Sequence, residues 1–314
     1  MVTTRSVSYT RPAGLSAPGA RGSTRVAPAD IPGPAEILGR ARTENFRVAS
    51  RLLPARSREH LMAYYGFARL VDQLGDAYDG DRLAALDWLE DEARLALGDP
   101  GREDLHPLVA RAAGAVRTVH ADPATLTDLI AANRQDQVVT TYADRDELVA
   151  YCRLSANPVG RFVLAAFGMS TPERERWSDA ICTGLQLAEH WQDIAEDARA
   201  GRVYLPADDM ARFGVTSEEL AGAPPASRAL RALLAFEVAR ARRVLEEGAP
   251  LVASLPGRCR WAVAGFWAGG AAALDAIAAT GFDPLRGSPR PAPSRVARQL
   301  GAVLRDRQPH REAA

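Results

Sequence analysis

Apolar residues recur at every third or fourth position along most of the chain, and the alternation typical of β-strands is missing. This spacing predicts an all-α protein. Proline and glycine residues separate the expected helices. These span residues 35–52, 57–78, 81–97, 105–119, 122–142, 144–155, 158–168, 172–199, 226–253 and 258–280.

The two ends of the chain lack this regular pattern. Residues 1–34 are rich in Pro, Gly, Ala, Ser and Arg, and we expect a disordered extension because they bury little apolar surface. A packed domain is expected over residues 35–285, followed by a Pro- and Arg-rich tail, 286–314. Some apolar residues of the tail repeat at helical spacing: Val296, Leu300, Val303 and Leu304. A loosely docked tail and a basic helix touching anionic lipid both remain open.

Composition narrows the possible partners. Acidic and basic residues balance at 39 each, so we expect no nucleic-acid partner. The three cysteines lie far apart without a CxxC motif, and the N-terminus lacks the apolar run of a secretory signal, which together favour a cytoplasmic protein. The long apolar stretch from Trp261 to Phe282 includes a Gly pair and Asp275, which favour a buried core helix over a membrane span.

Two of the expected helices carry clustered acids on one face. In the helix 57–78, at ~100° per residue, four side chains fall within an arc of roughly 60°: Tyr65, Arg69, Asp72 and Asp76. The helix 172–199 likewise groups five polar side chains: Gln186, Glu189, His190, Asp193 and Asp197. Apolar residues occupy the opposite faces and are expected to pack into the core.

Spacing alone is weak evidence for a site. Asp87 and Asp91 have the same four-residue separation in an ordinary amphipathic helix, which we interpret as a solvated face. A simple helical scaffold therefore remains an alternative. However, carboxylates crowded on one face repel each other, and a bound cation would relieve this repulsion. Magnesium suits two facing acid pairs because it bridges carboxylates to phosphate oxygens.

Several other chemistries lack their motifs. There is no glycine-rich nucleotide loop, no HExxH zinc motif and no GxSxG nucleophile elbow. A di-iron bundle would need two ExxH motifs on helices, whereas the single one, Glu103 to His106, precedes a proline. The histidines do not cluster, and four of them are interpreted as surface or structural: His60, His106, His120 and His310.

The two acidic segments resemble those of the squalene/phytoene synthase family. YYGFARLVDQLGD at 64–76 is similar to the first aspartate-rich segment of that family, and GLQLAEHWQDIAEDARAGRVYLP at 184–206 is similar to the second. YCRLSANPVGR at 151–161 resembles its central segment. The resemblance covers residues 38–285 and implies a single-domain isoprenoid synthase helical fold with a central active-site cavity.

The resemblance also implies roles for individual residues. The magnesium-binding and catalytic acids would be Asp72, Asp76, Asp193 and Asp197, with Glu189 as a further metal ligand. Tyr151 would lie close to the reacting carbons. The substrate diphosphate or its metal shell would be contacted by Asn45, Tyr65, Arg69, Gln186, Gln192, Arg202 and Tyr204. Candidate aromatic walls for a carbocation are Phe46, Phe162, Phe167, Trp191, Phe266 and Trp267.

Departures from the family pattern point to one branch of it. Gln73, Glu189 and Gln192 stand where many members have Asp, Asn and Arg, and ENFRVASRLLP at 44–54 lacks the usual serine-rich diphosphate contact. Together with SANPVGR and HWQDIAED, these segments resemble the hydroxysqualene synthases of hopanoid synthesis. The implied reaction is magnesium-dependent ionisation of presqualene diphosphate followed by water capture, without a nicotinamide cofactor. Head-to-head joining of two prenyl diphosphates and a non-catalytic assembly factor remain alternatives.

Overall fold

A computed structural model describes residues 31–40 and 55–305 of the chain. Within these ranges the fold is all-α, as predicted, with one isolated bridge between Thr141 and Val203. The helices are α1 (Pro34–Arg40), α3 (Ala55–Asp76), α4 (Arg82–Gly98), α5 (Pro107–Thr118), α6 (Ala124–Asp136), α7 (Arg145–Ser155), α8 (Asn157–Ala166), α9 (Pro172–Arg199), α10 (Ala207–Phe213), α11 (Ser217–Leu220), α12 (Arg228–Glu247), α13 (Pro250–Ser254), α14 (Gly257–Ala279), the 3-10 helix η1 (Pro284–Arg286) and α15 (Pro293–Arg305).

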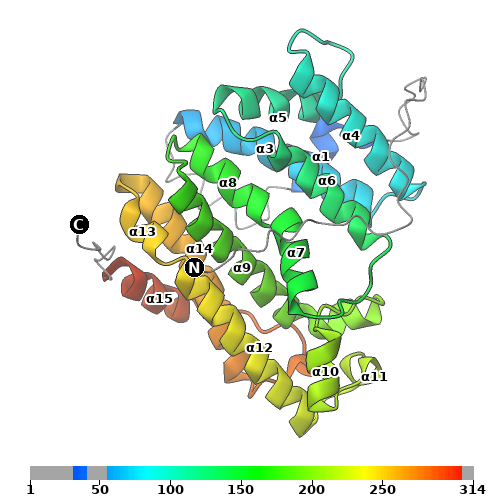
Figure 1. Cartoon of the computed structure of the whole chain (residues 1–314), viewed down its shortest axis with the longest axis vertical. Helices are drawn as coiled ribbons and strands as arrows, with labels where there is room; N and C mark the ends of the chain where they lie inside the picture. Colours follow the sequence, from blue (N-terminus) through cyan, green and yellow to red (C-terminus); the bar gives the residue numbers. More distant parts are fainter. Residues whose placement is uncertain (1–30, 41–54, 306–314) are drawn as a thin grey trace, which may run out of the picture.

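Two apolar clusters hold these helices together. One cluster unites α9, α12 and α14, and the other unites α3, α4, α5 and α6. In Figure 1, α9 runs through the middle of the molecule, with the α3–α6 group on one side and α12 and α14 on the other. Side chains predicted to face the core do so: Phe67, Leu70, Leu74 and Trp191 are almost completely buried.

Side-chain caps fix the starts of several helices. The carboxylate of Asp144 accepts a hydrogen bond from the backbone N–H of Glu147 at the start of α7, and the hydroxyl of Thr171 accepts one from Arg174 at the start of α9. Such caps satisfy backbone donors that would otherwise lack partners. They set where α7 and α9 begin and therefore which of their side chains face inward.

Two of the expected helices were wrong in extent, and two short helices were missed. The helix expected over 122–142 ends at Asp136 and is followed by a turn, after which the carbonyl of Thr140 accepts a hydrogen bond from the N–H of Val203 at 2.8 Å. The helix expected over 226–253 is divided into α12 and α13 by a turn at residues 248–249, just before Pro250, which has no N–H to continue the helical hydrogen bonds. The short helices α10 and α11 were not predicted.

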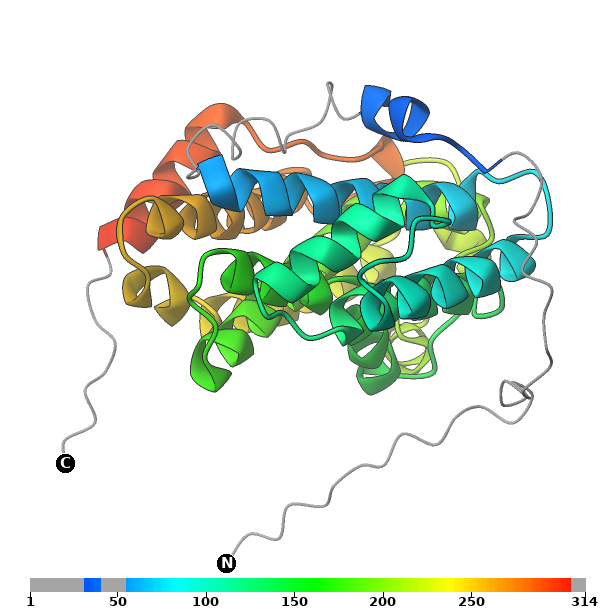
Figure 2. The same ribbon diagram turned by 90° about the horizontal axis from the view of Figure 1, so that it is seen from above.

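The C-terminal segment is a docked helix. Along α15, Val303 is buried and Leu300 and Leu304 pack against the cluster of α9, α12 and α14. Two side chains of α15 also donate to the carboxylate of Asp275 on α14, Arg298 at 2.9 Å and Gln299 at 2.7 Å. Figures 1 and 2 show α15 lying beside α14. Packing against the protein therefore accounts for the amphipathic pattern of the tail.

Helix α14 is long and apolar enough to cross a membrane by composition alone. However, 67% of its most apolar window is buried inside the protein. This agrees with the prediction of a buried helix at this position. Three segments lie outside the described residues: 1–30 of the extension expected to be disordered, 41–52 of the helix expected over 35–52, and 306–314 of the tail.

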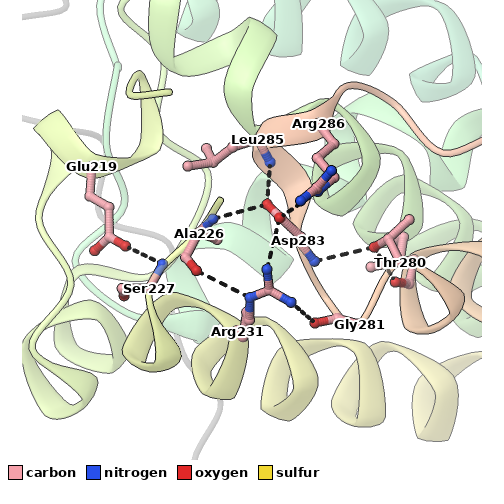
Figure 3. A network of polar contacts seen from close by, with 10 residues as sticks. Glu219, Ala226, Ser227, Arg231, Thr280, Gly281, Asp283, Leu285 and Arg286 are labelled. Atoms are coloured by element: carbon pink, nitrogen blue, oxygen red, sulfur yellow. Dashed lines mark hydrogen bonds and ion pairs between the residues drawn. The ribbon is translucent and has the colours of Figure 1, made fainter. Parts of the chain in front are cut away.

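A buried carboxylate, Asp283, ties the C-terminal segment to the body of the fold. One of its oxygens accepts from the backbone N–H groups of Ala226 and Leu285, and the other from Arg231 and Arg286, at 2.9 to 3.3 Å. Figure 3 shows these contacts converging between the start of α12 and η1. Burial tends to raise the pKa of Asp283, but the Ala226 N–H and the two guanidiniums hold it below its usual range.

Candidate active site

The acids singled out in the sequence line one cavity. It has a volume of about 390 Å³ and lies where α3 and α6 face α7 and α9. Its wall includes Asp72 and Asp76 from α3 and Glu189, Asp193 and Asp197 from α9. The two four-residue pairs therefore face the same space from different helices. Asp87 and Asp91 do not belong to this wall.

A glycine lets the first acidic helix approach α6. At Gly75, an added Cβ would lie 2.2 Å from the side-chain oxygen of Asn133, which itself lines the cavity. The side chain of Gln137 donates to the carbonyl of Gly75 at 3.0 Å. These contacts fix the end of α3 that carries Asp72 and Asp76.

The turn after α9 brings a guanidinium over the acids. Gly201 adopts a φ of +83°, a left-handed conformation that favours glycine, and the N–H of Arg202 then bonds back to the carbonyl of Asp197 at 2.8 Å. The Arg202 guanidinium lies 3.3 Å from the carboxylate of Asp76. Arg202 thus links the turn after the second acidic segment to the first.

Confinement within the cavity changes the electrostatics of the acids. Burial, followed by repulsion from Asp193, raises the pKa of Asp197 to about 6. Glu189 also lines the cavity, where reduced contact with solvent, followed by repulsion from Asp193, raises its pKa. Such crowding is relieved by a bound cation, so this donor set fits a divalent metal.

The carboxylates of α3 and α9 do not form a complete metal-binding site by themselves. Among the residues that the structure describes, no three Asp, Glu, His or Cys side chains converge on one point. Magnesium commonly binds through one or two carboxylates and completes its octahedron with water and substrate phosphate. The separated pairs on α3 and α9 fit that mode better than an all-protein site.

Polar and aromatic residues make up the rest of the wall. Tyr151, Tyr204 and His190 line it, and the rings of His190 and Tyr204 stack with centroids 3.7 Å apart. Burial lowers the pKa of His190 to about 3, so its imidazole is neutral at physiological pH. Its ring nitrogen lies 3.2 Å from the side-chain amide of Gln186, another wall residue.

Three residues that the resemblance placed near the diphosphate, Tyr65, Arg69 and Gln192, are not on this wall. Arg69 pairs with Asp72 at 3.4 Å, and the amide of Gln192 donates to the carbonyl of Pro289 at 2.5 Å. Tyr65 is half-buried outside the cavity lining. Asn45 lies outside the described residues.

Five of the six expected aromatic wall residues do not line this cavity. Phe162 and Trp191 are buried in the two clusters, Phe167 packs against both, and the indole N–H of Trp267 donates to the carbonyl of Leu245. Phe266 is exposed, and none of these five residues lines the cavity. Phe46 lies outside the described residues. The hydrophobic periodicity that marks an aromatic residue as apolar does not distinguish a core position from a cavity wall.

The sequence interpretation missed Asp136, Asn133 and Ser155, which line the cavity from α6 and α7. The hydroxyl of Tyr151 donates to Asp136 at 2.8 Å, and burial raises the pKa of Asp136 to about 7. One signal was available, since Leu129, Asn133 and Asp136 fall on one helical face. Using this signal requires knowing that this face of α6 packs against the face of α3 that carries the acids.

Comparisons with known proteins show what the chain is similar to. The sequence model of the family described as "Squalene/phytoene synthase" matches residues 40–298. The chain is 40% identical to a hydroxysqualene synthase of Rhodopseudomonas palustris over 218 residues, covering 68% of this chain and 72% of the relative. A hydroxysqualene synthase of Zymomonas mobilis is 35% identical, with 68% and 71% covered.

Solved structures share the fold. The crystal structure of a squalene synthase from Alicyclobacillus acidocaldarius superimposes with a TM-score of 0.74 at 40% identity, covering 79% of this chain and 92% of that one. A dehydrosqualene synthase in complex with ligand gives a TM-score of 0.75 at 24% identity, with 86% and 94% covered, and shows a likeness of fold alone.

Proposed function

The chain belongs to the squalene/phytoene synthase family and is an enzyme of isoprenoid synthesis, and from this premise we propose that it is a hydroxysqualene synthase. It takes presqualene diphosphate, ionises it, and captures the rearranged carbocation with water. The observation that carries the proposal is the single cavity onto which two acid pairs and Arg202 converge. Relatives named hydroxysqualene synthase at 35–40% identity support this choice of reaction.

The acids of α3 and α9 provide the metal-binding half of the cavity. Asp72, Asp76, Glu189, Asp193 and Asp197 would hold magnesium together with the diphosphate oxygens. Bound magnesium supplies electrostatic stabilisation of the negative charge that develops as the diphosphate departs. Because the donors come from two helices, substrate is needed to complete the coordination, and metal and diphosphate should bind cooperatively.

Other residues position the substrate around the diphosphate. Arg202 carries a permanent positive charge over Asp76 and would bind a diphosphate oxygen. Neutral His190, stacked on Tyr204, contributes a rigid aromatic surface without adding a second positive charge beside a carbocation. Leu129, Val159 and Ala68 provide apolar wall for the hydrocarbon.

The proposal is tested by incubating purified protein and magnesium with presqualene diphosphate or with farnesyl diphosphate, and identifying the products by mass spectrometry. We expect the C30 alcohol from presqualene diphosphate and no consumption of farnesyl diphosphate alone. Condensation of farnesyl diphosphate would instead assign a head-to-head prenyl transferase. Consumption of neither substrate would contradict both reactions and favour the assembly factor.

A matched pair of variants separates site chemistry from stability. Asp193→Asn removes a charge from the cavity and should lower the rate on the order of a hundredfold without lowering the melting temperature. Asp91→Asn removes a charge with the same helical spacing from an exposed face of α4 and should leave the rate unchanged. Equal effects of the two variants would contradict the assigned role of the α9 pair.

A further inference from the structure

The cavity wall contains buried polar atoms that have no hydrogen-bond partner in the part of the chain that the structure describes. Asp136 accepts a hydrogen bond from Tyr151 through Oδ2, whereas its Oδ1 is buried and has no partner among the described residues. The hydroxyl oxygen of Ser155 is likewise buried and has no hydrogen-bond partner among the described residues. Tyr151 and Ser155 are one helical turn apart on α7, and both line the cavity beside Asp136.

Buried polar atoms without partners are unfavourable, and an ordered water commonly satisfies them. A carboxylate and a hydroxyl supply the polar contacts that a water molecule needs, and both side chains lie on the wall of the cavity. Nearby Leu129, from the same face of α6, and Val159 of α8 are apolar and leave space for hydrocarbon. Water and hydrocarbon can therefore meet here.

We propose that Asp136, Ser155 and Tyr151 form the subsite that holds the attacking water, with Asp136 taking its proton. This inference rests on the proposed function, since the water becomes the hydroxyl group of the product. Asp136 and Ser155 contact the water directly. Tyr151 is a positioning residue, because its hydrogen bond holds Oδ2 of Asp136 and directs Oδ1 to the water.

The capture step conserves atoms and electrons. The diphosphate has already left with the electron pair of its C–O bond, so the rearranged C30 carbocation lacks two electrons at one carbon. The water oxygen donates a lone pair to that carbon and forms a new C–O bond. One water proton then passes to the Asp136 carboxylate, leaving a neutral alcohol and a protonated carboxyl that later loses its proton to solvent.

The electrostatic surroundings of Asp136 suit a proton acceptor. Burial raises its pKa to about 7, while the Tyr151 hydroxyl and Arg202 lower it and Asp76 and Asp197 raise it. A group with a pKa near the working pH combines a usable fraction of the basic form with a real affinity for the proton. Residues of α3, α7, α9 and the turn after α9 thus set the pKa of Asp136.

The test compares Asp136→Asn with Asp128→Asn, a partly buried aspartate on the same helix that does not line the cavity. Both proteins are given magnesium and presqualene diphosphate, and diphosphate release and C30 products are measured separately. For Asp136→Asn we expect diphosphate release within about threefold of the wild type and a ratio of alcohol to hydrocarbon at least about tenfold lower. Asp128→Asn should match the wild type in both measurements.

Two results would overturn the subsite: an unchanged alcohol fraction in folded Asp136→Asn, or a loss of diphosphate release equal to the loss of alcohol. Should Asp136→Asn not fold, Ser155→Ala decides, with a smaller fall of the same ratio expected and an unchanged ratio contradicting the proposal. If the wild type makes no alcohol at all, the proposed function fails and the subsite with it. If the wild type makes alcohol and both variants do so equally, the subsite alone fails.

Discussion

At the scale of single residues, the burial of Asp136 against Tyr151 should make the free energy of unfolding depend on pH. This effect can be measured apart from catalysis. The Asp136 pKa of about 7 in the folded protein exceeds the value of about 4 expected in the unfolded chain. The folded state therefore binds this proton more tightly, and the stability it contributes is present at low pH and lost as the pH rises to about 7.

Asp136→Asn removes this pH dependence while keeping the shape of the side chain. We expect its effect on the free energy of unfolding to be more favourable at pH 8 than at pH 5, by on the order of 2 kcal/mol. Urea denaturation at the two pH values measures the difference. Asp91→Asn on the exposed face of α4 is the control, and a difference of equal size in both variants would argue against burial as the cause.

A substitution at Arg202 tests whether the shape of the cation, as well as its charge, matters for binding the diphosphate. Arg202→Lys keeps the charge but loses the planar guanidinium, which can contact two oxygens at once, so we expect KM for the diphosphate substrate to rise about tenfold. Steady-state kinetics checks this. Arg199→Lys, an exposed residue at the end of α9, should leave KM unchanged. An unchanged KM for Arg202→Lys would show that this guanidinium does not bind the diphosphate.

At the scale of helices, the contact of α3 with α6 depends on the absence of a side chain at Gly75. Gly75→Ala gains about 1 kcal/mol of helix propensity but drives a methyl group against Asn133, at a cost of about 1–3 kcal/mol. We expect lower activity, because Asp72 and Asp76 share this turn of α3. Melting curves and initial rates measure the two effects.

Removing the obstructing side chain should relieve the clash. The double variant Gly75→Ala/Asn133→Ala is expected to be more stable than the sum of its two single variants predicts, by about 1 kcal/mol. Strict additivity would show that α3 and α6 adjust without strain and would remove the basis of this prediction. Asn133→Ala alone provides the necessary reference because Asn133 also lines the cavity.

Helices were predictable from the sequence where local chemistry decides them, and not where distant segments do. Periodicity and the proline and glycine breaks located α3, α7 and α9 to within a few residues. The end of α6 depends instead on pairing between Thr140 and Val203, which are far apart in the chain. Similarly, the acids on α3 and α9 could be identified from the sequence because they cluster on one face of each helix. The place of Asp136 in the cavity depends instead on how α6 packs against α3.

At the scale of the whole molecule, Asp283 joins the segment before α15 to the start of α12. Asp283→Ala would leave two guanidiniums and two backbone donors without their acceptor, so we expect the free energy of unfolding to fall by roughly 3 kcal/mol at neutral pH. Because its pKa is lowered, the stabilising effect of Asp283 is present at neutral pH and disappears as the pH falls through its folded-state pKa.

Denaturation of Asp283→Ala and of a control, Asp79→Ala, separates this anchor from a general loss of acidic charge. Asp79 is exposed after the end of α3 and should change stability by less than about 0.5 kcal/mol. The difference between the variants should shrink in acid. A difference that stays constant with pH would indicate that packing, and not the charge of Asp283, supports this region.

The position of the cavity between two apolar clusters has a consequence for motion. Because α3 packs in one cluster and α9 in the other, we expect the two walls to move slightly relative to each other without loss of either cluster. A diphosphate with its metal would contact both walls of the cavity and hold them together. We expect the amide hydrogens of α3 and α9 to exchange with deuterium more slowly, and to a similar degree, once both are bound, whereas those of α15 should keep their rate. The ligand would then complete the enzyme's architecture as well as serve as its substrate.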